Sequence, residues 1–470
     1  MEMRYGMNPQ KGNGYYLTGN RINLTNPTNP RFMQIDKVTF NDISIFHTEE
    51  ELSIFHKLNF TKTGVGKEWL RRLFSQPHED IKRVIGTQNI IKSLLEHLDE
   101  WPTDISNGTI LVMDKFLDYN IDPVPSARST LNDVTYKIFH SSDYSMIKYS
   151  IRHFADFYRG LKKLSRLFTI AELPPQFQFY ADRINKVLRE APLQELSLTN
   201  SGDKFSMKQN LHYAYHVSTT YKRDTLEMID VFGRLEAWYS MAVAVKTFGL
   251  TFPKFRDSDQ PHFTAEGLHH ILLDHPVSYD LIMNPDQNFL FLTGANMAGK
   301  STLIKAIGSS VFLAHIGMGV PVRSMELTLF DGLLSNITVQ DNIVKGESYF
   351  FNEVQRIKTT IQKINDGKKW LVLIDELFKG TNVQDAMKCS LAVIKGLVKM
   401  KNSLFILSTH LYEIGDELKP YSNIAFKYFE TNVTDDQLDF SYQLKEGISN
   451  DRIGYVILRR EGVVNMLDKL

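Results

Sequence analysis

Residues 289–302 read Phe-Leu-Phe-Leu-Thr-Gly-Ala-Asn-Met-Ala-Gly-Lys-Ser-Thr, an apolar strand that runs directly into the pattern Gly294-x4-Gly299-Lys300-Ser301. The pattern is typical of a phosphate-binding loop, because its glycines let successive backbone N–H groups close around phosphate oxygens. Lys300 supplies a charge for the β- and γ-phosphates, and the Ser301 hydroxyl is a ligand for Mg²⁺. A helix is expected to begin near Lys300 and to add the positive end of its dipole to the same anion. The candidate binding residues are Gly294, Ala295, Asn296, Met297, Ala298, Gly299, Lys300, Ser301 and Thr302.

A second stretch fits the same kind of site. Residues 370–376, Trp-Leu-Val-Leu-Ile-Asp-Glu, form a buried-strand pattern that ends in two carboxylates. In such an arrangement Asp375 holds Mg²⁺, and Glu376 orients or deprotonates a water. The alternative is a core strand followed by a solvated acidic turn, which the upstream phosphate loop disfavours. A similar-looking stretch, residues 63–67, lacks the full glycine spacing and a preceding strand, so we expect a turn that opens a helix.

The composition is that of an ordinary globular protein. With 470 residues the chain is long enough for two or three domains, each with its own core. Lys and Arg number 54, as do Asp and Glu, so any contact with nucleic acid has to come from a local patch or from molecular shape. The single cysteine, Cys389, excludes an intramolecular disulfide. Without a signal-like N-terminus or a membrane-length apolar run, we expect a soluble cytoplasmic protein with no membrane contact.

The chain is predicted to be multidomain, with an all-α core and lever domain followed by an α/β domain. Residues 1–30 are rich in Asn, Gly, Thr and Pro, which favours a loose extension. Residues 31–255 show apolar residues at three- and four-residue spacing, which predicts helices. In residues 256–470 strand-like runs alternate with helical patterns, which predicts a parallel sheet with a ligand at the carboxyl ends of its strands. The strand-like runs are residues 289–293, 371–375 and 404–408.

One long helical stretch carries a basic stripe. Its apolar face is formed by Ile147, Ile151, Phe154, Tyr158, Leu161, Leu164 and Phe168. The stripe on the opposite face is formed by Lys148, Arg152, Arg159, Lys163 and Arg166. Such a stripe either follows a phosphate backbone or is the solvated face of a helix, and the sequence favours the second interpretation.

Together with four further motifs, the phosphate loop makes the chain resemble the MutS family of DNA mismatch-repair ATPases. The Asn-Met pair between the glycines of residues 294–302 is distinctive of that family. Residues 347–353, Glu-Ser-Tyr-Phe-Phe-Asn-Glu, are similar to its Ser-Thr-Phe signature, and residues 375–385 resemble its carboxylate pair and Gly-Thr loop. Residues 407–410, Leu-Ser-Thr-His, are similar to its Thr-His switch. Its closing glycine-rich segment is matched by Gly447, Gly454 and Gly462.

The N-terminal half matches less sharply. Residues 36–77 are similar to the start of the family's helical core, and residues 235–253 to the lever helix that returns to the ATPase. Only about thirty residues precede this core, so we expect the family's mismatch-recognition and connector domains to be absent. The motifs also depart from the family at several positions: Ala295 and Ala298 replace Pro and Gly, Phe378 and Lys379 replace Gly-Arg, and His270-Ile271 stands near a His-Pro. A bulky Phe378 beside the catalytic carboxylates is expected to alter turnover.

The resemblance implies an ABC-like P-loop ATPase that uses ATP and Mg²⁺. It assigns Lys300 to neutralising phosphate charge, Glu376 to positioning the attacking water, and His410 to sensing the γ-phosphate. Ser301 and Asp375 would hold the metal ion. A hydrogen-bonded core histidine is the alternative for His410.

Ser348 would be presented to the ATP of a second subunit, which requires a homodimer with composite sites. A simple helix N-cap is the alternative for Ser348. The helix that follows is expected to bury Val354, Ile357, Ile361 and Ile364.

For the whole protein, the resemblance implies that nucleotide state opens and closes paired levers and so controls binding to mismatched or branched DNA, with a repair protein as a further partner. One alternative is a nucleotide-gated dimeric scaffold without mismatch recognition, acting on an RNA or protein assembly. A chromosome-organising or double-strand-break ATPase is disfavoured, because those proteins carry long coiled coils between their two ATP motifs.

Overall fold

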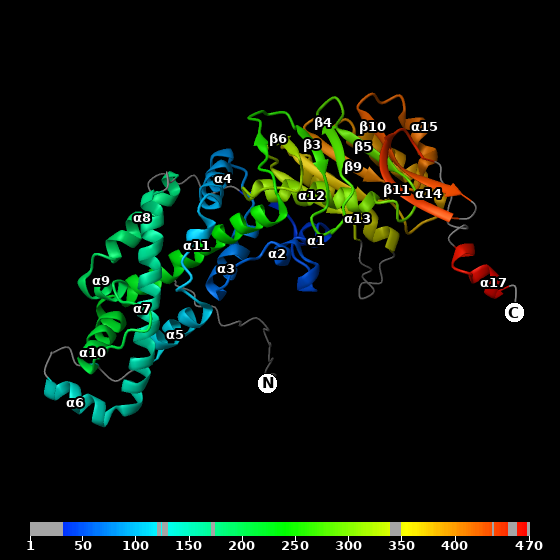
Figure 1. The fold of residues 1–470 in the computed structure, drawn as a ribbon. Helices are drawn as coiled ribbons and strands as arrows, with labels where there is room; N and C mark the ends of the chain where they lie inside the picture. Colours follow the sequence, from blue (N-terminus) through cyan, green and yellow to red (C-terminus); the bar gives the residue numbers. More distant parts are fainter. Residues whose placement is uncertain are drawn as a thin grey trace, which may run out of the picture.

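The computed structural model describes residues 32–119, 124, 130–170, 174–338, 349–434, 437–449 and 458–467. An elongated arm of helices joins a body built around two sheets, and helix α11 runs from the arm into the body (Figure 1). None of the helices in the described ranges is both long and apolar enough to cross a bilayer.

Helices make up almost all of the regular structure between Lys37 and Phe248. They are α1 (Lys37–Asp42), η1 (Glu50–Leu52), α2 (Ile54–Lys57), α3 (Gly64–Phe74), α4 (Ile81–Leu95), η2 (Leu98–Glu100), α5 (Asn107–Asp118), α6 (Thr130–Phe139), α7 (Ser141–Ile170), α8 (Pro175–Val187), α9 (Ala191–Ser197), α10 (Met207–Tyr215), the π-helical turn η3 (His216–Thr220) and α11 (Lys222–Phe248). Helix α3 begins at residue 64 with Thr63 as its N-cap, which confirms that residues 63–67 open a helix.

The long helix α7 buries its apolar face and exposes only part of its basic stripe. All seven predicted face residues, from Ile147 to Phe168, are buried. Arg159 and Lys163 both pair with Asp104, at 2.8 and 2.7 Å. Two of the five stripe cations are therefore already neutralised within the chain.

The larger sheet has seven strands in the order β1-β7-β8-β9-β5-β10-β11. Adjacent strands in this sheet run parallel, except that β11 pairs antiparallel with β10. The strands are β1 (Gln34–Ile35), β5 (Phe289–Thr293), β7 (Gly332–Asn336), β8 (Trp370–Asp375), β9 (Ser403–Ser408), β10 (Ile424–Thr434) and β11 (Gln437–Glu446). The three runs expected at 289–293, 371–375 and 404–408 are thus confirmed as neighbouring strands.

Alternation along the central strands gives this sheet two apolar faces. In β5, Leu290 and Leu292 join the cluster that contains α12 (Lys300–His315), whereas Phe289 and Phe291 join the cluster that contains α13 (Tyr349–Ile364) and α14 (Val383–Leu397). Because both faces are covered, every residue of β5, β7, β8 and β9 is buried. The expected α/β architecture with a parallel sheet is therefore observed for this part of the chain.

The remaining elements flank this layered core. A four-stranded sheet has the order β2-β6-β3-β4 and contains β2 (Lys254–Phe255), β6 (Ser324–Leu327), β3 (Phe263–Leu268) and β4 (Tyr279–Met283). Short helices follow β9 and β11, namely η5 (Tyr412–Ile414), α15 (Gly415–Leu418) and α17 (Val463–Leu467). The domain boundaries expected at residues 30 and 255 remain predictions.

A strand pair and a histidine side chain are among the contacts that join the N-terminal segment to the sheet body. Strand β1 pairs with β7, so that Gln34 lies opposite Gly332. At the far end of α12, Nδ1 of His315 donates to the carbonyl of His78 at 2.7 Å, and Nε2 of the same ring accepts from the N–H of Phe330 at 3.2 Å. Burial lowers the pKa of His315 to about 4, so the ring is neutral and uses both nitrogens.

Candidate nucleotide-binding and hydrolysis site

The loop between β5 and α12 has the backbone shape that its glycines predict. Gly294 and Gly299 adopt left-handed φ values of 135° and 106°, and Gly299 is the N-cap residue of α12. A Cβ on Gly294 would lie 3.1 Å from the carbonyl oxygen of Phe429 in β10. Met297 also has a positive φ and is 74% exposed at the tip of the loop. The turn therefore places consecutive backbone N–H groups in front of the helix N-terminus.

Lys300, the first residue of α12, folds back across this loop. Its Nζ donates to the carbonyl oxygens of Gly294 and Ala295, at 2.8 and 2.9 Å, although the residue is only 6% exposed. Burial lowers the pKa of Lys300 to about 8, against the opposing charges of Glu376 and Asp375. The ammonium is thus held inside the loop by weak acceptors, where a phosphate would be a stronger partner.

Ser301 and Asp375 meet at the carboxyl ends of β5 and β8. The Ser301 hydroxyl donates to Oδ2 of Asp375 at 2.6 Å. The other oxygen of this carboxylate, Oδ1, accepts from the hydroxyl of Ser408 at the end of β9. Because Ser408 fixes one oxygen of the Asp375 carboxylate, its Oδ2 and the Ser301 hydroxyl lie side by side as candidate oxygen ligands.

Glu376 lies between the side chains of His410 and Lys379. Its Oε1 is 2.9 Å from Nε2 of His410, and its Oε2 is 3.4 Å from Nζ of Lys379. A carboxylate only accepts, so Nε2 of His410 donates this bond. Burial would raise the pKa of Glu376, but the hydrogen bond from His410 and the charges of Lys379, His410 and Lys300 together lower it to about 2. Nε2 of His410 also lies 3.3 Å from Nζ of Lys300.

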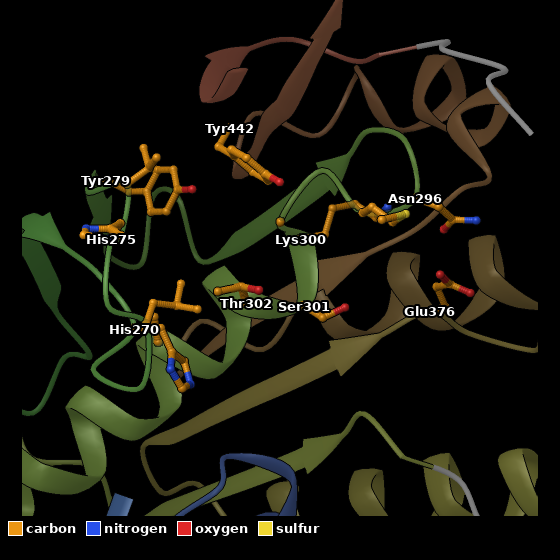
Figure 2. Close-up of a pocket in the computed structure, with 14 residues that line it drawn as sticks. His270, His275, Tyr279, Asn296, Lys300, Ser301, Thr302, Glu376 and Tyr442 are labelled. Atoms are coloured by element: carbon orange, nitrogen blue, oxygen red, sulfur yellow. The ribbon is translucent and has the colours of Figure 1, made fainter. Parts of the chain in front are cut away.

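Lys300, Ser301 and Glu376 line one cavity of about 440 Å³. Figure 2 shows Glu376 on one side of Lys300, and Tyr279 and His275 on the other. Tyr442 also lines the cavity. Burial raises the pKa of Tyr279 to about 12, so its hydroxyl stays protonated. One end of the cavity is therefore charged, and the other is aromatic with polar edges.

The predicted site residues are brought together with few exceptions. Asn296, Met297, Gly299, Lys300, Ser301, Thr302 and Glu376 all line the cavity. Ala295 and Ala298, which replace the family's Pro and Gly, are buried in the adjoining core, and Asp375 lies behind Ser301. Ser348 lies outside the described residues, as does Gly454 of the closing glycine segment. His270 is a further lining residue, and burial lowers its pKa to about 4.

The predicted core face of α13 is confirmed for Ile357 and Ile364 and is wrong for Val354 and Ile361. Val354 and Ile361 are 36% and 39% exposed, while Glu353, Ile357, Thr360 and Ile364 are buried. The helix is rotated so that Glu353 points inward, where Oε1 and Oε2 accept from the N–H groups of Lys379 and Gly380 at 3.0 and 3.1 Å. Two charge-assisted hydrogen bonds thus outweigh the burial of an additional valine.

Phe378, in the same loop, contacts helix α13. Its ring is 4% exposed and lies 5.7 Å from that of Phe350, measured between centroids. Its backbone has a positive φ of 59°, as does that of Glu376 with 63°. This unusual backbone turns the Phe378 side chain into the apolar cluster below the sheet.

Sequence reasoning missed three contributors to the site. Ser408 and Glu353 both stand within recognised motifs, but nothing in their spacing reveals which carboxylate or N–H group they contact. The sequence shows that Lys379 stands where the family has Arg, but it does not show that its ammonium faces Glu376. A search for buried polar residues beside the carboxylate pair would have found Ser408 and Glu353.

Comparison with known proteins places the site within a recognised domain. Residues 290–466 match the family model described as MutS domain V. That range includes the strand before the phosphate loop, both carboxylates and His410.

Individual relatives match over about half of the chain. The DNA mismatch repair protein MutS of Petrotoga mobilis is 29% identical over 231 residues, which are 48% of this chain and 28% of that protein. The DNA mismatch repair protein MSH3 of Candida glabrata is 32% identical over 48% of this chain and 23% of its own length. The DNA mismatch repair protein spellchecker 1 of Drosophila melanogaster is 26% identical over 52% of this chain and 27% of its own length. The matched segment thus spans about a quarter of each relative.

Proposed function

The chain belongs to the MutS family, and on that premise we propose that it binds and hydrolyses ATP and couples its nucleotide state to binding of mismatched or branched DNA. One observation carries the ATPase part of this proposal. Ser301, at the start of α12, lies 2.6 Å from Asp375 at the end of a neighbouring strand, and Glu376 follows directly. This is the arrangement that P-loop ATPases use to hold a metal ion and a water beside the γ-phosphate.

The residues present fit Mg-ATP. The positive φ values at Gly294, Met297 and Gly299 open the loop to phosphate oxygens, and Lys300 already occupies its interior. Ser301 and Asp375 would hold Mg²⁺, which neutralises phosphate charge when it is bound.

Hydrolysis would divide the work among three side chains. Glu376 accepts a hydrogen bond from the attacking water and holds it in line with the γ-phosphate. Lys300 stabilises the charge that develops on the phosphate oxygens. His410 can donate from Nε2 either to Glu376 or to a phosphate oxygen close to Lys300, because Nε2 lies within 3.3 Å of both groups. That choice would let His410 report whether the γ-phosphate is present.

We further propose a homodimer with composite sites and a lever-like helical arm. The support is the family relationship and the long arm, α3 to α11, that is attached to the ATPase body (Figure 1). Ser348 would complete the site of the other subunit. We also propose that the protein is cytoplasmic, that it is associated with DNA, and that it acts with a repair protein as partner.

The deciding experiment measures ATP hydrolysis and DNA binding together. Wild-type protein is titrated with homoduplex, mismatched duplex, four-way junction and single-stranded RNA at low salt, with and without Mg-ATP. We expect DNA to stimulate hydrolysis and ATP to change DNA affinity. Hydrolysis without binding to any DNA would reject the DNA part alone, and no ATP binding at all would reject the proposal.

A second candidate is a nucleotide-gated dimer that acts on an RNA or protein assembly. It is favoured by the pairing of Arg159 and Lys163 with Asp104, which leaves three cations of the α7 stripe without an ion pair to another described residue, namely Lys148, Arg152 and Arg166. In the same titration, stimulation by RNA but not by DNA would select this candidate.

A further inference from the structure

A buried carboxylate ties helix α13 to the loop that carries the hydrolytic residues. Glu353 is 5% exposed and accepts from two consecutive backbone N–H groups, those of Lys379 and Gly380. The contact is close along its length, since a Cβ on Gly380 would lie 2.6 Å from the backbone nitrogen of Phe350. The ring of Phe378 packs on Phe350 from the same loop. Residues 378–380 are thus fixed to the first turns of α13 by polar and apolar contacts.

The same loop sets the surroundings of Glu376. Lys379 follows it by three residues and places Nζ 3.4 Å from Oε2. Because Glu353 holds the backbone of Lys379, any shift of α13 moves the cation that faces the catalytic carboxylate. Among the described residues, two further contacts hold Glu376: its N–H donates to the carbonyl of Ser408 at 3.0 Å, and its side chain contacts His410.

We propose that Glu353 is a positioning residue for ATP hydrolysis, which locks the Lys379–Gly380 backbone to α13 and thereby sets the orientation of Glu376. The role rests on the proposed ATPase function. It also gives α13 a direct mechanical connection to hydrolysis: the helix begins at Tyr349, immediately after Ser348 in the sequence. A displacement at the start of α13 is transmitted to the water-positioning group within two turns of helix.

The principal test is Glu353→Gln. Glutamine keeps the shape of the side chain but presents an amide N–H₂ group to one of the two backbone donors, so one hydrogen bond is lost. We expect kcat to fall by about tenfold or more, while the dissociation constant for a fluorescent ATP analogue stays within about twofold. The control is Gln355→Ala, an exposed position on the same helix, with kcat unchanged.

An independent variant disturbs the contact from the other side. Gly380→Ala introduces a methyl group against Phe350 and should reproduce the loss of kcat at unchanged ATP affinity. Its matched control is Gly396→Ala in α14, where no atom lies within 4 Å of the added Cβ. If one variant unfolds, as judged by its thermal midpoint, the other still decides the question.

A double variant tests the route of action. If Glu353 acts by placing Lys379, then Glu353→Gln should add little to the loss of kcat caused by Lys379→Ala. Wild-type turnover in both Glu353→Gln and Gly380→Ala would overturn the inference, as would equal losses of kcat and ATP binding. Failure of wild-type protein to hydrolyse ATP would instead reject the proposed function.

Discussion

Nε2 of His410 lies 2.9 Å from Oε1 of Glu376, so the group proposed to position water is hydrogen-bonded to the group proposed to sense phosphate. The first prediction follows from this pair. Glu376→Gln removes the negative charge but leaves the loop and Lys300 intact, so ATP should bind normally and hydrolysis should fall by at least about 100-fold. Phosphate release and binding of a fluorescent ATP analogue measure the two effects. Glu417→Gln, at an exposed position, is the control, and undiminished turnover in Glu376→Gln would remove Glu376 from this role.

The buried ammonium of Lys300 predicts a pH dependence of binding. Burial lowers its pKa to about 8, and a phosphate ligand would favour the charged form. Affinity for ATP should therefore be constant below about pH 7 and should fall above pH 8, with a slope that approaches tenfold per pH unit. Titrations between pH 6.5 and about pH 9.5 measure this slope. Lys305→Ala should keep the fall and Lys300→Ala should abolish binding, whereas a flat wild-type profile would contradict the prediction.

The Ser301–Asp375 pair predicts a change in metal requirement. Ser301→Ala removes one oxygen ligand, so the Mg²⁺ concentration for half-maximal hydrolysis should rise about tenfold. A chelator should stop wild-type hydrolysis, and added Mg²⁺ should restore it. Ser309→Ala changes a buried serine farther along α12 and should leave the Mg²⁺ requirement unaltered. An identical Mg²⁺ dependence in Ser301→Ala would show that the hydroxyl is not a ligand.

The composite site predicts complementation between two inactive variants. Lys300→Ala disables a subunit's own phosphate loop, and Ser348→Ala disables the residue that it lends to its partner. In an equimolar mixture half of the dimers are mixed and each has one intact site, so activity should recover to about a quarter of wild type. Hydrolysis is measured before and after mixing and re-equilibration. No recovery from two folded, dimeric variants would argue that each subunit is catalytically self-contained.

The neutral histidine between α12 and the N-terminal helices predicts a stability effect. His315→Ala leaves the His78 carbonyl and the Phe330 N–H without a partner and should cost about 3 kcal/mol of unfolding free energy. Because the pKa of His315 is lowered to about 4, its contribution is complete above about pH 6.5 and is lost as the pH falls towards 4. Denaturant unfolding at pH 7.5 and pH 5 measures both effects. His47→Ala, at an exposed position, should change stability by less than about 0.5 kcal/mol, and an equal loss in both variants would refute the special role of His315.

The phosphate loop and its neighbouring strands were predictable because their signals are local. An apolar run, two glycines and a lysine at fixed spacing require one backbone shape, and β5, β8 and β9 were found where expected. The position of the carboxylate pair was predictable as well, because Asp375 and Glu376 stand at the end of an apolar strand pattern.

The remaining features depend on contacts between residues that are far apart in the sequence. The rotation of α13 could not be predicted from the spacing of its apolar residues. Glu353 faces inward because it accepts hydrogen bonds from the N–H groups of Lys379 and Gly380. The ion pairs of the basic stripe on α7 could not be predicted for the same reason, because Asp104, which pairs with Arg159 and Lys163, lies in the distant segment that precedes α5. The closeness of Phe378 to the carboxylates in sequence suggested an effect on turnover, whereas its side chain packs against Phe350; that effect stays a prediction.

Strand β1 has a consequence for how the chain reaches its native state. Its partner β7 lies about three hundred positions later, so during synthesis β1 must wait, unpaired, until the residues between the two strands have left the ribosome. Separating the two halves genetically would leave the exposed border of β7 free to recruit other chains. Co-expression of both pieces, rather than isolation of the half that contains the phosphate loop, is therefore the route to a well-behaved split protein.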